Sequence, residues 1–150
     1  MAGVCMLFAR LLIVSVFILA GINKFQEPQG IIVMTKGSID NTQYFLKEQH
    51  KIMDLPLKDL MKENAESIVY AVAVVEIVGG LLVLAGSKFA SFVLFSMLVG
   101  FTAMVHNPFL DKLKEGEKLF QWKMTFYNTL IMLSLLVIIG YNGKRAVARK

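Results

Sequence analysis

Four long apolar stretches constrain what this chain can fold into. They cover residues 4–22, 67–87, 89–105 and 124–141, and only two charged residues, Arg10 and Glu76, lie within them. A helix needs about 20 mostly apolar residues to cross a bilayer, and in lipid its backbone groups must bond to one another. No segment alternates apolar and polar residues as a membrane β-strand does. The sequence therefore predicts an all-α protein, an integral membrane four-helix bundle that forms a single domain over residues 1–150.

The composition excludes most soluble proteins. Hydrophobic residues make up 56% of the 150 positions and charged residues 18%, against about 25% charged residues in a soluble domain. Such an apolar chain is not expected to stay disordered either. The charged residues are grouped between the apolar stretches, which is typical of a chain whose main solvent is lipid.

The second and third stretches are separated only by the short run Gly86-Ser87-Lys88. A glycine at a helix end followed by a polar residue favours a tight turn, so these two spans should form an antiparallel hairpin. An even number of crossings then places both termini on one side of the membrane. The first stretch has no basic cluster before it, as a secretory signal would, so we expect it to remain as a span.

The charges divide unequally between the terminal side, which carries both chain ends, and the opposite loop side. The terminal side has six basic residues and no acidic residue, whereas the loop side has ten lysines and ten acidic residues. Lys and Arg near span ends favour the cytoplasmic side, so we predict both termini in the cytosol, or in the matrix if the membrane is the mitochondrial inner membrane. The tail residues expected to contact anionic lipid are Lys144, Arg145, Arg149 and Lys150. The pI near 9.4 reflects this one-sided excess, and no folded basic patch indicates nucleic-acid binding.

The connection over residues 23–66 is long for a helical bundle, and its pattern predicts amphipathic helices. Asp40 or Asn41 is expected to cap one helix that ends near Met53, and Pro56 to open a second. These helices have two interpretations. They could cover the membrane surface, or they could form a docking surface for a partner protein.

Arg10 and Glu76 are costly inside a membrane and should face the bundle interior. Their backbones lie about 9 and 15 Å from the terminal side, counted at 1.5 Å per residue. An ion pair between them is one interpretation. In the other, Arg10 reaches the interface by itself and Glu76 is protonated.

A second polar group is expected at the loop-side end of the spans. Lys24 ends the first span, His106 ends the third, and Asn128 lies one turn into the fourth. They could line a small polar pocket near that surface, or they could be ordinary interfacial residues.

Small residues predict where the helices approach closely, because membrane helices pack through such positions. On the second span they share a face with Glu76. The candidates for helix packing are Gly21, Gly79, Gly80, Ser96 and Gly100.

The chain lacks the side chains that most redox or hydrolytic chemistry requires. Cys5 is the one cysteine, so this chain cannot form an internal dithiol pair or a Cys-ligated iron–sulfur cluster. His50 and His106 are the two histidines, and no phosphate-binding or nucleophile motif is present. We therefore expect no metal site, no cofactor and no catalytic residue, which favours a protein that is not an enzyme.

Two motifs resemble those of the DoxX-like membrane proteins. Arg10 followed by the run AGINK at positions 20–24 is similar to their first-span signature, and the run EIVGGLL at 76–82 is similar to their second-span pattern. His106 and Asn128 stand where that family tends to carry His and Asn. The long first loop looks more like the related plant HR-like lesion-inducing proteins, which tend not to keep the second-span Glu.

This resemblance, which covers about residues 7–141, implies a four-helix integral membrane protein. Family members are associated with membrane oxidoreductase assemblies, including quinone-linked sulfur oxidation, and others serve as cargo or assembly factors. Our main expectation is a non-catalytic accessory subunit, with other membrane subunits as partners, for example in a mitochondrial respiratory complex. The alternative is a quinone-interacting oxidoreductase component that uses Glu76 or His106, and a weaker third interpretation is a transport or cargo-receptor protein.

Overall fold

A computed structural model describes residues 2–147, with side chains described for residues 4–141. Helices and the turns between them account for this whole region, and it contains no strand. Four helices are long and apolar enough to cross a membrane, which confirms the predicted all-α membrane fold. These are α1 (Ala2–Gln26), α4 (Ala65–Leu84), α5 (Lys88–Val105) and α6 (Glu115–Val147).

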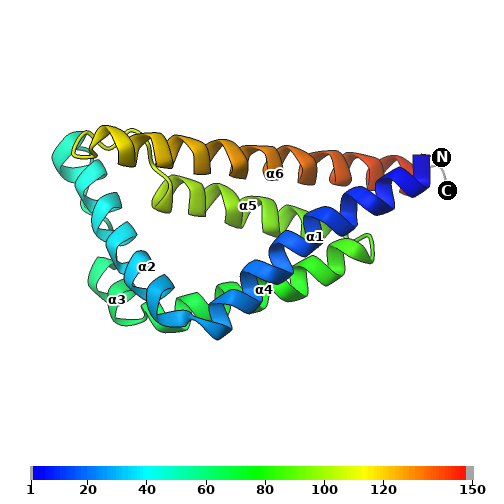
Figure 1. The fold of residues 1–150 in the computed structure, drawn as a ribbon, viewed down its shortest axis with the longest axis horizontal. Coiled ribbons are helices and arrows are strands. Elements are labelled where there is room, and N and C mark those ends of the chain that lie inside the picture. Colours follow the sequence, from blue (N-terminus) through cyan, green and yellow to red (C-terminus); the bar gives the residue numbers. More distant parts are fainter. Residues whose placement is uncertain (1, 148–150) are drawn as a thin grey trace.

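The four spans form two closely packed pairs. Helix α1 packs mainly on α4, and α5 packs mainly on α6. The turn between α4 and α5 joins the pairs. Gly86 adopts φ +94° there, and the Ser87 hydroxyl caps α5 by accepting a hydrogen bond from the Ala90 amide at 3.2 Å. The start of α1 and the end of α6 lie at the same end, and the two pairs diverge away from it (Figure 1).

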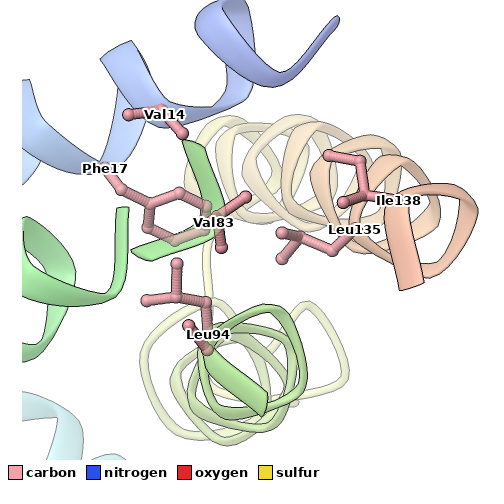
Figure 2. Close-up of a cluster of buried hydrophobic side chains, with 7 residues drawn as sticks. Val14, Phe17, Val83, Leu94, Leu135 and Ile138 are labelled. Carbon is pink, nitrogen blue, oxygen red and sulfur yellow. The ribbon is translucent and has the colours of Figure 1, made fainter. Parts of the chain in front are cut away.

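A cluster of buried apolar side chains joins all four spans in the half nearest the termini. Figure 2 shows Phe17 of α1, Val83 of α4, Leu94 of α5 and Leu135 of α6 pointing toward one another. Each of these side chains is nearly or fully buried. This cluster is where the two pairs are held together, so the loop-side half of the bundle depends on other contacts.

Helix α2 (Pro28–Gln43) supplies those contacts by packing on both α4 and α5. It bridges the space between the diverging pairs (Figure 1). It starts directly after α1, where Glu27 breaks the helix and Pro28 occupies the first position, which proline tolerates. Ile32 and Ile39 form its buried face.

The predicted cap at Asp40 or Asn41 is wrong, because both residues lie inside α2. Helix α2 starts earlier because Pro28 occupies its first position and because Ile32 and Ile39, on one face, are buried. Asp40 instead accepts hydrogen bonds from Lys62 at 2.8 Å and forms an ion pair with Lys58 at 3.0 Å. Both lysines come from the short helix α3 (Lys58–Glu63).

The chain after α2 contacts the segment that connects α5 and α6. It continues as the π-helical segment η1 (Tyr44–Gln49). The Tyr44 hydroxyl donates to Asp111 at 2.9 Å, and the Gln49 amide donates to the Phe109 carbonyl at 2.7 Å. The two connections on the loop side are therefore attached to each other.

Helix α6 begins at Glu115, well before the apolar stretch that starts at residue 124. Acidic residues in a first turn are favourable near the positive end of the helix dipole. Glu117 also accepts a hydrogen bond from the Lys114 amide at 3.0 Å. These interactions start α6 among the charged residues that separate the third and fourth apolar stretches.

Candidate functional site

Lys24 of α1 and Glu76 of α4 form an ion pair inside the bundle. The Lys24 Nζ donates to Glu76 Oε2 at 2.7 Å and to Oε1 at 2.9 Å. The two side chains are only 13% and 10% exposed. A buried pair of this kind satisfies two charges that would each be costly alone in a membrane.

Glu76 therefore pairs with Lys24, and the Arg10–Glu76 interpretation does not describe this structure. The Arg10 Nη1 lies 3.7 Å from where a Cβ of Gly86 would be, so its guanidinium is beside the α4–α5 turn. Helices α1 and α4 run in opposite directions, so Arg10 near the start of α1 meets the end of α4. Lys24 then lies opposite the more central Glu76.

Glycines bring these helices close enough for the pair to form. A Cβ on Gly21 would lie 2.6 Å from Ile77 Cγ1 and 2.8 Å from the Ala73 carbonyl oxygen. On α4, a Cβ on Gly79 would lie 3.0 Å from Leu94 of α5, and one on Gly80 would lie 3.4 Å from Ile18 of α1. Gly21 is thus a point of direct contact between α1 and α4, one turn before Lys24.

The predicted packing role of Ser96 and Gly100 is wrong. Ser96 is exposed, and a Cβ on Gly100 would meet nothing within 4 Å. Helix α5 packs through another face, which carries Ala90, Leu94 and Thr102. Small residues are tolerated on either face in lipid, so their spacing did not identify the buried one.

The ion pair lies in the wall of a cavity of about 330 Å³. His106 and Asn128 also line this cavity, while most of its remaining wall is apolar. The structure therefore brings together Lys24, His106 and Asn128 as the pocket interpretation expected. Glu76 also lines this cavity, although the sequence analysis had grouped it with Arg10.

Hydrogen bonds orient the other two polar side chains. The Asn128 amide donates to the Thr102 hydroxyl at 3.0 Å, and that hydroxyl donates to the Leu98 carbonyl at 2.7 Å. His106 Nδ1 lies 3.3 Å from Gln121 Oε1. With that oxygen as acceptor, Nδ1 carries the proton and Nε2 of the neutral ring is an acceptor.

Burial lowers the pKa of His106, and the hydrogen bond to Gln121 opposes this only in part. The ring is therefore neutral near neutral pH. Since the Lys24–Glu76 pair is also neutral as a unit, the cavity combines strong hydrogen-bonding groups with no net charge. Such a site suits a small uncharged group with exposed carbonyl or hydroxyl oxygens.

Sequence reasoning missed Thr102 and Gln121, which hold Asn128 and His106 in place. Thr102 precedes His106 by four residues, so helical spacing places both on one side of α5. That spacing was a usable signal for Thr102. Gln121 carried no comparable signal, because it lies before the apolar stretch of the fourth span.

A larger cavity of about 490 Å³ is lined mainly by apolar side chains of η1, of α5 and of the segment that follows α5. Thr102 and His106 also contribute to its wall. It lacks the ion pair and Asn128. Within residues 2–147, no group of three or more His, Cys, Asp or Glu side chains is arranged to hold a metal ion.

The basic tail is described only in part. Lys144 and Arg145 belong to the last turns of α6, but their side chains are not described. Arg149 and Lys150 lie outside the described residues. Contact between the tail and anionic lipid therefore remains a prediction.

Comparisons with known proteins identify the family. Searches of curated proteins and of solved structures find no match. The family model described as DoxX matches residues 5–107. This match covers more than half of the chain and includes Lys24, Glu76 and His106, so the chain belongs to the DoxX family.

Proposed function

We propose that this protein is a non-catalytic binding subunit of a membrane oxidoreductase assembly, which holds the polar head of a quinone-type lipid beside the Lys24–Glu76 pair. The observation that carries the proposal is the convergence of this pair, His106 and Asn128 on one cavity. Membrane proteins keep ionisable side chains in a span mainly where they serve a function.

The chemistry of the cavity fits a quinone head. A quinone ring is flat, mainly apolar and uncharged, and it carries two carbonyl oxygens. The Lys24 ammonium group already donates to Glu76 and, at 3.4 Å, to the Ala20 carbonyl. The Asn128 amide donates to Thr102 and has a second N–H that can donate to a quinone carbonyl. The volume of about 330 Å³ lies at the small end of ligand pockets, as a single-ring head requires.

The non-catalytic part of the proposal is supported by the sequence. One cysteine and two histidines offer few ligands for a redox centre in this chain. Electrons would then be exchanged with another subunit. A respiratory complex of the mitochondrial inner membrane is the assembly that we propose as the native partner.

Binding can be measured in lipid nanodiscs with a ubiquinone analogue that carries a decyl chain. Quinones quench tryptophan fluorescence, and the single Trp122 is adjacent to Gln121, the partner of His106. We expect saturable quenching of the unmodified protein. The double variant Lys24→Met/Glu76→Leu removes both charges together and should weaken binding at least tenfold.

Ser134→Ala is the matched control, because the Ser134 hydroxyl bonds within α6 to Leu130 and does not line the cavity. Asn128→Leu is a second test variant that keeps the ion pair. If neither variant weakens saturable binding while the protein remains folded, the proposed site is wrong.

The partner can be tested separately by purification from the native membrane. We expect the chain to migrate with a discrete oxidoreductase complex. Migration only as an isolated protein would contradict the role as a subunit, and it would leave the binding experiment to decide the role as a quinone site.

A further inference from the structure

We infer that the ligand enters this cavity sideways from the bilayer, through an opening between α1 and α6, and that its apolar chain stays in this opening. The inference rests on the proposed function and specifies the ligand. The site would take a membrane-dissolved amphiphile with a chain, and would bind a chainless, water-soluble compound less well.

Three sides of the cavity are closed by helix contacts. Gly21 packs α1 directly against α4, and on the α4–α5 side helix α2 packs on both helices. On the third side, α5 and α6 are joined by the Asn128–Thr102 hydrogen bond and by the bond from the Thr125 hydroxyl to the His106 carbonyl at 2.7 Å. A ligand cannot pass between these pairs without breaking them.

Side chains also lie at the two ends of the cavity. Phe17 lines the cavity and belongs to the apolar cluster that joins the four spans toward the termini. On the loop side, Ile31 and Met34 of α2 contribute to the wall, together with His106. The terminal-side end is therefore closed by packed side chains, whereas the loop-side end is covered only in part, because Met34 is 47% exposed.

The remaining side lies between α1 and α6, which contact each other much less than either contacts its main partner. Val16 and Asn23 of α1 line the cavity here, and both are exposed, Val16 by 45%. On α6, the partly exposed Met124 and Ile131 line the same side. Behind these residues, the side chains of Lys24 and Glu76 are only 13% and 10% exposed.

The depth of this opening identifies what lies outside it. Val16 is near the middle of the candidate membrane span Val4–Gln26, and Ile131 lies well inside the span Glu115–Tyr141. The opening therefore faces hydrocarbon. A chain attached to the bound head would extend past Val16 and Ile131 into lipid, where it retains its apolar surroundings.

The experiment compares two probes in nanodiscs, the decyl ubiquinone analogue and the same head group without a chain. Val16→Trp and Ile131→Trp fill the opening. We expect each to weaken equilibrium binding of the decyl probe at least tenfold and to change binding of the chainless probe less than threefold. Leu19→Trp is the control, because Leu19 is exposed on α1 and does not line the cavity.

A second readout does not depend on a bulky substitution. Cys5 is the only cysteine, so Val16→Cys in a Cys5→Ala protein carries one thiol, at the opening. We expect the decyl probe to slow its reaction with a lipid-soluble maleimide at least fivefold, and the chainless probe to have little effect.

The possible failures are distinguishable. If neither probe binds the unmodified protein saturably, the proposed function is wrong. If both probes bind but the tryptophan variants weaken neither, or weaken both equally, the lateral opening is wrong and the quinone site stands. A similar loss in Leu19→Trp would also overturn the inference.

Discussion

The Lys24–Glu76 pair predicts a strong energetic coupling between two residues that are far apart in the sequence. Removing one partner of a buried pair leaves an uncompensated charge, which costs about 3–5 kcal/mol. We expect Lys24→Met and Glu76→Leu each to lower the free energy of unfolding by this amount. The double variant should be close to the unmodified protein, because it removes both charges.

A double-mutant cycle of unfolding in detergent measures this coupling. Additive losses in the double variant would show that the two side chains do not stabilise each other. The cycle also establishes that the double variant is folded, which the binding experiment requires.

Gly21 gives a second prediction at the residue scale. A Cβ at this position would lie 2.8 Å from the Ala73 backbone oxygen, and a backbone atom cannot move aside easily. Overpacking of this kind costs about 1–3 kcal/mol, so Gly21→Ala should lower the unfolding temperature in detergent. Gly100→Ala is the control, since its Cβ would meet nothing within 4 Å, and it should be neutral or slightly stabilising because alanine favours helices.

Sequence reasoning located most of the polar cavity but did not predict how its charges pair. Lys24, His106 and Asn128 each lie near the loop-side end of a span, so span boundaries alone grouped them. The pairing of Glu76 depends on how far α1 slides along α4, and the close contact at Gly21 fixes that register. Residue spacing within one helix carries no information about register between helices.

At the scale of elements, the sequence predicted helices in the first loop but not the bounds of α2. Its N-terminal half contains Gly30 and its middle contains Gly37, and glycine inside a helix usually weakens it. Tertiary contact overrides this preference, because Ile32 and Ile39 are buried against the bundle. The fourth span was likewise extended to Glu115 by interactions at its start, which hydropathy does not measure.

Asp40 predicts a pH dependence for the attachment of α3 to α2. Hydrogen bonds from Lys62 and Lys58 lower the pKa of Asp40 below its usual 3.8. A carboxylate with a lowered folded-state pKa stabilises the fold above its unfolded pKa, and this contribution is lost as pH falls through the folded value. Protection of the α3 amides from hydrogen exchange should therefore fall below about pH 4.

Asp40→Asn should reduce this protection at neutral pH and remove its acid dependence. The matched control is Asp111→Asn, because Asp111 lies in the segment between α5 and α6 and its carboxylate accepts a hydrogen bond from Tyr44. Acid dependence that persists in Asp40→Asn would assign the effect to another carboxyl group.

For the whole molecule, four apolar stretches were sufficient to predict the fold class, since each can satisfy its backbone only as a helix in lipid. The divergence of the two helix pairs was not predictable in this way. It depends on the apolar cluster around Phe17 and Leu135 near the termini and on α2 at the other end. These are contacts between segments far apart in the chain, and they create the cavity.

The topology predicts that tags at both termini are accessible from one side of the membrane. The uneven distribution of Lys and Arg further predicts that this is the cytosolic or matrix side. In a Cys5→Ala protein, Ile52→Cys should react with an impermeant maleimide only from the opposite side, because Ile52 is exposed in the first loop. Protection of one terminal tag and exposure of the other would contradict the arrangement.

The sequence distance between Lys24 and Glu76 has a consequence for biosynthesis. The two residues are 52 positions apart, and a ribosome adds about 5–20 residues per second. About 3–10 s therefore pass between the synthesis of Lys24 and the synthesis of its carboxylate partner. During this interval the first span is inserted without the helix on which it packs, so Lys24 has to remain hydrated at the loop-side surface until α4 arrives.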